Sequence, residues 1–245
     1  MQPSWVPYWR KLEDNSTRPY DLRDLFEADC GLPLDIGAVL DNRYENRLTL
    51  VGYWFGTVSD VSVVASRSVL ENAQQTLETV QTFQTLLETK AVHVGPLDMG
   101  ATLIACTNEA RLRATKDECA MLPAWLKYLE EHGDTPLLWR DLLASGETCD
   151  PIMLQLSAYQ EAVRKALNSR RCFVTNSAFI GLGPASMGPG DIVAILHGCT
   201  WPVILRPHGE RYKILGTCYT HGAMDGEIVR ERQAQDVQPQ TFIVV

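Results

Sequence analysis

The sequence lacks a long apolar run, a basic cluster and a secretion signal. No apolar stretch reaches the roughly 20 residues that a membrane span requires, and no basic segment followed by an apolar one marks the Met1 end. The net charge is −8, from 22 Lys and Arg against 30 Asp and Glu. Nucleic-acid binding depends on clustered cations. These absences predict a protein with neither a membrane partner nor a nucleic-acid partner.

Cysteine pairs at metal or redox spacing are also missing. The seven cysteines of the 245 residues are scattered, odd in number and never arranged as C-x-x-C. Such usage favours buried free thiols in a reducing compartment over a disulfide framework. With an ordinary 45% of hydrophobic residues, the chain has the composition of a globular protein, and we expect it to be cytoplasmic.

Recognised cofactor motifs are absent as well. The glycines of Gly181–Pro184 would bind a dinucleotide only if a helix opened on them, and Pro184, Gly188 and Pro189 prevent that. His197 and Cys199 form a single pair, which is too few ligands for a zinc site. We therefore expect no cofactor and no metal.

Helical spacing dominates the middle of the chain, after one predicted strand at Arg47–Phe55. Ser68 and Glu71 have the spacing of a capping box, which predicts a helix from Ser68 to about Thr89. Further helices are predicted at Asp98–Ala110, Lys116–Glu131 and Leu137–Leu143.

The last predicted helix begins at Asp150-Pro151, with Asp as the N-cap and Pro at the first position. Its expected buried face consists of Ile152, Leu156, Tyr159, Val163 and Leu167.

The periodicity changes after Asn168, where short β-rich runs alternate with turns. The predicted strands are Cys172–Thr175, Ala178–Leu182, Ile192–His197, Val203–Arg206 and Tyr212–Tyr219. Strands spaced so closely indicate a curled antiparallel sheet or a small β-barrel. The predicted fold class is α+β, with a helical middle packed against a mostly C-terminal antiparallel sheet or small barrel.

This C-terminal third carries a series of short sequence blocks. They are R-R-C-F-V-T at 170–175, G-L-G-P at 181–184, P-G-D at 189–191, L-R-P at 205–207 and H-G-A-M-D-G-E at 221–227. The series resembles the C-terminal module of fungal heterokaryon-incompatibility (HET) proteins.

The start of the chain strengthens this resemblance. Pro3–Trp9 reads P-S-W-V-P-Y-W and is similar to the segment that joins the HET domain to its C-terminal region, with Tyr8 in place of the usual Asp. The resemblance implies a single HET-like C-terminal module over 1–245, with the HET domain itself absent. Within it we expect an extended arm at 1–30, a strand plus helices at 31–168 and an antiparallel β subregion at 169–245. Whether Met1 is a natural start stays open.

Two polar features are candidate sites. His221 lies near Asp225 and Glu227 in sequence, and a carboxylate beside an imidazole suits acid–base chemistry. The alternative is a structural polar cluster that closes the fold through hydrogen bonds. Arg206 is either a clamp for a substrate carboxylate or one half of an ion pair with Asp191 or Glu227, and such pairs are commoner than clamps.

Two functions remain, and the first is enzymatic. A detached module without cofactor motifs suits cofactor-independent chemistry on a small apolar metabolite: a cyclase, isomerase or pericyclase such as a Diels–Alderase in fungal secondary metabolism. His221, Tyr219 and Arg206 are then the expected catalytic donors. The aromatic residues expected to bind the substrate are Trp54, Tyr53, Trp201 and Phe179.

The alternative is a non-catalytic regulatory or protein-interaction module of heterokaryon incompatibility. An exposed apolar patch would favour it. A closed cavity between the C-terminal sheet and the helical middle would favour the enzyme. A homodimer is left open in either case.

Overall fold

The structure, a computed structural model, describes residues 25–33, 48–70, 72–132 and 150–245. The chain divides into two compact units. We call residues 1–61 with 173–245 the barrel unit and residues 62–172 the helical unit, and each is described by itself. Most of the predicted arm at 1–30 and the predicted helix at Leu137–Leu143 lie outside the described residues. The fold is α+β, as the sequence predicts.

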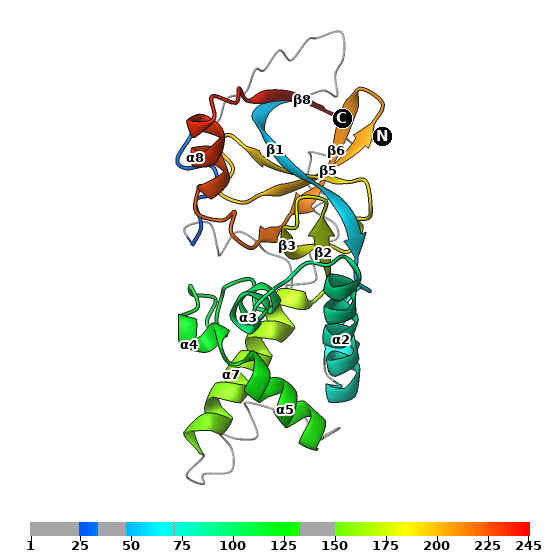
Figure 1. Cartoon of the computed structure of the whole chain (residues 1–245), viewed down its shortest axis with the longest axis vertical. Coiled ribbons are helices and arrows are strands. Elements are labelled where there is room, and N and C mark those ends of the chain that lie inside the picture. Colours follow the sequence, from blue (N-terminus) through cyan, green and yellow to red (C-terminus); the bar gives the residue numbers. More distant parts are fainter. Residues whose placement is uncertain (1–24, 34–47, 71, 133–149) are drawn as a thin grey trace. The chain divides into compact units, whose positions relative to one another are not determined.

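One eight-stranded sheet runs through the described residues (Figure 1). Its strands are β1 (Leu48–Val61), β2 (Arg170–Thr175), β3 (Ile180–Pro184), β4 (Ile192–Leu196), β5 (Val203–His208), β6 (Arg211–Thr217), β7 (Tyr219–Thr220) and β8 (Gln240–Val244). Their order is β4-β5-β6-β8-β1-β2-β3-β7, and β4 also pairs with β1. That extra pairing closes β1, β4, β5, β6 and β8 into a ring, which is the small barrel expected from the sequence.

The 14-residue strand β1 makes this closure. Its first residues pair with β8, its middle with β4 and its end with β2, always antiparallel. The register shifts between Trp54 and Gly56 and again between Val58 and Asp60. Such bulges bend a strand, so one strand can serve three partners. The predicted strand at Arg47–Phe55 is confirmed from Leu48, the first described residue of this segment, and continues to Val61.

Apolar side chains fill the barrel unit in two clusters. The first includes Phe173 and Ile195, and helix α8 (Glu227–Ala234) contributes Ile228 and Val229 to it. The second cluster consists of Leu50, Ala194, Leu196, Val203, Leu205, Phe242 and Val244. The closing block of the HET-like pattern therefore leads directly into a helix whose first turn is part of the core.

The helical unit contains six described helices (Figure 1). They are α1 (Arg67–Leu70), α2 (Ala73–Thr89), α3 (Pro96–Leu103), α4 (Lys116–Cys119), α5 (Leu122–His132) and α7 (Pro151–Leu167). Helix α5 packs against α2 and α7, and α3 also contacts α7. Trp125 of α5 is fully buried, with its ring edge-on to Tyr159 of α7 at a centroid distance of 5.4 Å. Among the described helices, none is long and apolar enough to cross a membrane.

Two predicted helices begin or continue differently in the structure. The predicted start at Ser68 is wrong for the long helix: α2 begins after Asn72, whose side chain accepts from the Gln75 N–H at 2.8 Å. The predicted helix Lys116–Glu131 is interrupted, giving α4 and α5. Pro123 lacks the N–H that a continuous helix would use to bond the Cys119 carbonyl.

Other helix boundaries follow from the backbone. The predicted helix Asp98–Ala110 ends early, at Leu103, because Ala105 and Cys106 both take a left-handed φ of 50°. The helix start at Asp150 is confirmed, since its carboxylate accepts from the Ile152 N–H at 3.0 Å. Of the predicted buried face of α7, only Ile152 is exposed. The buried members are Leu156, Tyr159, Val163 and Leu167.

Candidate functional site

Arg206 lies on β5 in an ion pair with Asp191. Its Nε and Nη2 donate to the two carboxylate oxygens, each at 2.8 Å, and Nη2 also donates to the Ser186 carbonyl at 2.8 Å. Asp191 is 2% exposed and accepts a further hydrogen bond from the Gly188 N–H. The hydrogen bond with Asp191 raises the pKa of Arg206. Of the two partners considered from the sequence, Asp191 and not Glu227 takes this role.

Tyr219 and His221 do lie together, at the end of the sheet. The Tyr219 hydroxyl is 3.1 Å from His221 Nδ1. The following turn is held by two other bonds: the Asp225 N–H donates to Glu227 Oε2, and Arg230 donates to the Asp225 carbonyl, both at 2.7 Å. These bonds give the closing block a structural role. Arg206 makes its hydrogen bonds elsewhere, so the three proposed donors do not converge through their hydrogen bonds.

Tyr53 and Trp54 are neighbours on β1 and face opposite sides of the sheet. Tyr53 is buried, whereas Trp54 is 43% exposed. The Trp54 indole donates to the Gly56 carbonyl at 2.9 Å, across the bulge. The two side chains therefore cannot form one wall of a pocket.

The other two aromatic candidates pack on neighbouring rings. Trp201 is buried, with its ring edge-on to Phe26 at 4.8 Å. Phe179 is half-buried, with its ring edge-on to Phe55 at 5.2 Å. Both contacts are typical aromatic packing, and neither residue lines the cavity described next.

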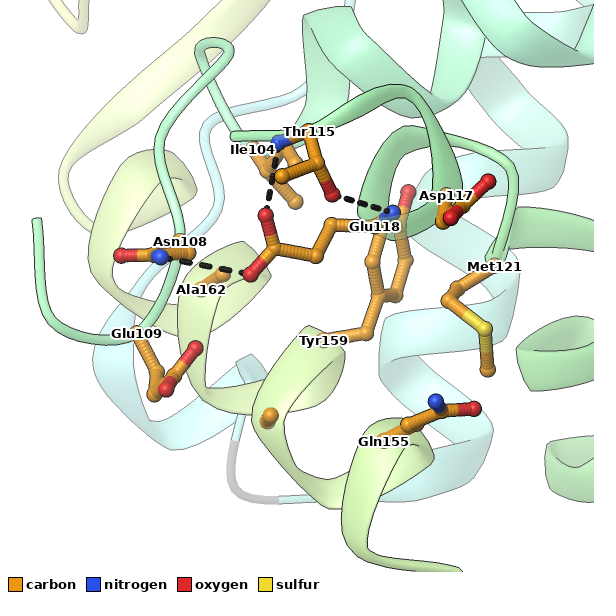
Figure 2. A pocket seen from close by; sticks show the side chains of 11 residues that line it. Ile104, Asn108, Glu109, Thr115, Asp117, Glu118, Met121, Gln155, Tyr159 and Ala162 are labelled. Carbon is orange, nitrogen blue, oxygen red and sulfur yellow. Dashed lines mark hydrogen bonds between the residues drawn. The ribbon is translucent and has the colours of Figure 1, made fainter. Parts of the chain in front are cut away.

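A cavity of about 380 Å³ lies within the helical unit (Figure 2). One part, which we call the apolar floor, consists of Ile104, Met121, Ala158, Tyr159 and Ala162. The other part, which we call the polar rim, consists of Asn108, Glu109, Thr115, Asp117, Glu118 and Gln155. Neither set was identified as a site from the sequence, because the residues come from separate segments that no motif connects.

Glu118 is the most firmly placed residue of the polar rim. Thr115 caps α4: its hydroxyl accepts from the Glu118 N–H at 3.2 Å, and the Glu118 carboxylate accepts from the Thr115 N–H at 2.7 Å. This is a complete capping box. The Asn108 amide donates to the other Glu118 oxygen at 3.2 Å, and Figure 2 shows the carboxylate between these two partners. The local fold thus fixes one carboxylate beside the floor.

Tyr159 is the one aromatic residue among the described residues of the apolar floor. It is 3% exposed, and its hydroxyl donates to the Gly100 carbonyl at 3.1 Å. Burial raises the pKa of Tyr159 far above its usual value, so the phenol stays neutral. The side chain therefore presents an uncharged ring to the cavity.

The polar rim carries negative charge only. Glu109, Asp117 and Glu118 contribute carboxylates, and among the described residues no Lys, Arg or His side chain lines the cavity. Within the described part of the chain, no hydrogen bond or ion pair engages the carboxylates of Glu109 and Asp117. The described residues contain no group of three or more His, Cys, Asp or Glu side chains suited to a metal ion. The arrangement can accept an apolar molecule and attract a positive charge to its edge.

Comparison with known proteins identifies the family. The Het-6 beta-barrel domain family matches residues 103–238, which is more than half of the chain. This chain belongs to the Het-6 beta-barrel domain family. The match includes the described cavity residues as well as most of the barrel strands.

Similarity to a curated protein agrees with the HET-like sequence blocks. The chain is 21% identical over 269 residues to heterokaryon incompatibility protein 6, OR allele, of Neurospora crassa. The alignment covers 96% of this chain and 39% of the relative, so the chain spans about two fifths of the relative's length. No solved structure matches. The resemblance to a HET C-terminal module is confirmed.

Proposed function

We propose that this chain is a small-molecule-binding module of the heterokaryon-incompatibility type, and that its binding site is the cavity of the helical unit. The cavity carries the proposal. Its volume of about 380 Å³ falls in the range of small-molecule sites, which are mostly apolar with a few well-placed polar groups. The apolar floor and the polar rim have that composition.

The contacts in the barrel unit support this choice of site. Arg206 is engaged with Asp191, and Trp201 packs against Phe26. A substrate at either residue would have to displace an existing contact. The cavity is open without any such displacement.

The family supports the biological role. Membership of the Het-6 beta-barrel domain family and the similarity to a heterokaryon incompatibility protein favour a part in fungal self/non-self recognition. In this proposal the bound molecule acts as a signal.

A second candidate is catalysis in the same cavity. A cofactor-independent cyclase, isomerase or pericyclase needs a shaped apolar site with charged groups at its edge. Glu118 is held beside the apolar floor, where a carboxylate can take up a proton or stabilise developing positive charge. This candidate keeps the chemistry expected from the sequence and assigns it to residues of the helical unit in place of His221, Tyr219 and Arg206.

Blocking the cavity tests the proposal. Ala158→Phe places a ring in the apolar floor from a half-buried position on α7. Ala124→Phe, at an exposed position of α5 that does not line the cavity, is the matched control. Each 245-residue protein is incubated with a fungal small-molecule extract, and native mass spectrometry then records any bound molecule. Melting curves verify that both variants fold.

We expect the wild type and Ala124→Phe to carry the same bound molecule and Ala158→Phe to lose it. Release of that molecule unchanged supports binding alone, and release of a rearranged isomer supports catalysis. A bound molecule that persists in folded Ala158→Phe places the site elsewhere and overturns the proposal, as does the absence of any bound molecule in all three proteins.

A further inference from the structure

We infer that the cavity of the helical unit selects an amphipathic amine, a molecule with a protonated amino group on an apolar body. This inference rests on the proposed function, because it names the class of ligand for the same site. The apolar floor, the one-signed charge of the polar rim and the pairing of the neighbouring cations carry it.

The charge of the rim determines the sign of the ligand. Carboxylates of Glu109, Asp117 and Glu118 line the cavity, and no cationic side chain in the described part of the chain does. Opposite charges attract most where water is partly excluded, and an anion would meet three negative groups. The rim therefore favours a cation and rejects a carboxylate or phosphate.

Two cations on α7, Lys165 and Arg164, are already engaged by other groups. Lys165 donates to the Glu109 carbonyl at 2.6 Å and pairs with Glu161 at 3.3 Å. Arg164 pairs with the same Glu161 carboxylate at 2.6 Å. The two cations thus share a carboxylate outside the cavity lining. No partner among the described residues occupies the carboxylates of Glu109 and Asp117, so these are the groups offered to a ligand.

The apolar floor determines the rest of the molecule. Tyr159, Ile104 and Ala162 are buried beneath the cavity, and contact with them is favourable only for apolar atoms. Glu118, held in position by Thr115 and Asn108, stands at the boundary between floor and rim. A ligand with an apolar body of a few rings or carbons and a terminal ammonium group satisfies both parts.

Three probes of similar shape but different charge separate the contribution of charge to binding affinity from that of apolar contact. They are 4-phenylbutylamine, 4-phenylbutanol and 4-phenylbutanoate, which are respectively cationic, neutral and anionic near neutral pH. Isothermal titration calorimetry with the 245-residue chain compares their affinities. We expect the amine to bind at least tenfold more tightly than the alcohol, the carboxylate not to bind, and added salt to weaken the amine.

Two double variants test whether the preference for the amine comes from the carboxylates of the polar rim. The double variant Glu109→Gln/Asp117→Asn removes two rim charges and keeps the shape. Glu88→Gln/Glu130→Gln removes two exposed charges of the helical unit that do not line the cavity, and so matches the change in net charge. We expect the first to weaken the amine about tenfold or more, and the second to change its affinity less than twofold.

Failure of this inference is distinguishable from failure of the proposed function. If the alcohol or the carboxylate binds as tightly as the amine and Ala158→Phe abolishes that binding, the cavity is a binding site for another class and the amine is excluded. If the amine does not bind at millimolar concentration, or binds equally to folded Ala158→Phe, the inference is overturned. An equal effect of both double variants overturns it too, because net charge would then be responsible.

Discussion

Arg206 and Asp191 join strand β5 to the residue just before β4 through two nitrogen–oxygen contacts of 2.8 Å. The carboxylate is buried, while 43% of the arginine side chain is exposed. Asp191 also accepts from the Gly188 N–H at 2.7 Å, so one carboxylate holds both the turn and the neighbouring strand. This arrangement assigns the P-G-D and L-R-P blocks to the stability of the barrel unit.

Removing the carboxylate tests that role. Asp191→Ala leaves the Gly188 N–H without its acceptor and the Arg206 guanidinium with the Ser186 carbonyl alone, and we expect the free energy of unfolding to fall by about 1–3 kcal/mol. Glu210→Ala, at an exposed position of the β5–β6 turn, is the control, with an expected change within about 0.5 kcal/mol. Urea unfolding measures both. Equal stabilities of the two variants would show that the ion pair contributes nothing.

Two glycines of the closing block differ in what surrounds them. Gly226 has φ +80° and Gly222 has φ +75°, a region that disfavours any side chain. A Cβ on Gly226 would lie 2.9 Å from the Cβ of Cys30, whereas nothing lies within 4 Å of a Cβ on Gly222. A side chain at either position would therefore meet the same unfavourable backbone conformation, and a side chain at Gly226 would also clash with Cys30.

We expect Gly222→Ala to cost about 1–2 kcal/mol from its backbone conformation, and Gly226→Ala to cost at least about 1 kcal/mol more from crowding. Thermal unfolding followed by circular dichroism compares the two variants. Should Gly226→Ala prove as stable as Gly222→Ala, the packing of Cys30 on this turn would be refuted.

Local sequence chemistry was enough to predict several elements. Asp150-Pro151 starts a helix because cap and proline act within one turn. The short apolar run Ile192–Leu196, which follows a turn, predicts a strand without knowledge of its partners. The HET-like blocks led to the family through the resemblance. The ion pair of Arg206 could be anticipated as one of two alternatives, because an arginine at a strand end needs an acid nearby.

Other features depend on contacts between distant residues. The pairing of β1 with β4 closes the barrel across more than a hundred residues, and no local pattern specifies it. The early end of α3 arises from left-handed residues at Ala105 and Cys106, neither of which is a glycine. The cavity combines the segment after α3 with one face of α7, where each residue looks ordinary in sequence.

Cysteine reactivity should follow burial. Cys30 is exposed, whereas burial raises the pKa of Cys172 to about 12 from 9.0. Each pKa unit lowers the thiolate fraction about tenfold, so we expect Cys172 to react about 1000-fold more slowly in the folded chain than in the unfolded chain, and the exposed Cys30 to react before it. Alkylation near neutral pH, mapped by peptide mass spectrometry, measures the order. All seven cysteines should react once the unreduced chain is denatured.

The control for this order is the unfolded chain, in which Cys30 and Cys172 should react at similar rates. If Cys172 were labelled in the native protein as fast as Cys30, the strand β2 would be open to solvent. A count below seven in the denatured protein would reveal internal disulfides.

The pairing of Glu161 with two cations on α7 should make stability depend on pH. Burial raises the pKa of Glu161, but the hydrogen bonds and charges of Arg164 and Lys165 outweigh it, and the net pKa is below 4.5. The pKa of Glu161 is lower in the folded chain than in the unfolded chain. The ionised carboxylate therefore stabilises the fold fully above the unfolded pKa, and this stabilisation is lost as the pH falls through the folded pKa.

We therefore expect Glu161→Gln to be less stable than the wild type by up to about 1 kcal/mol near neutral pH, and the difference to shrink as the pH falls below 4.5. Urea unfolding at a series of pH values measures it. In an Arg164→Gln background the same substitution should lose most of its effect, because the 2.6 Å ion pair is already gone. A difference that stays constant across this range, or that survives undiminished in the Arg164→Gln background, would show that packing of the side chain and not its charge is responsible.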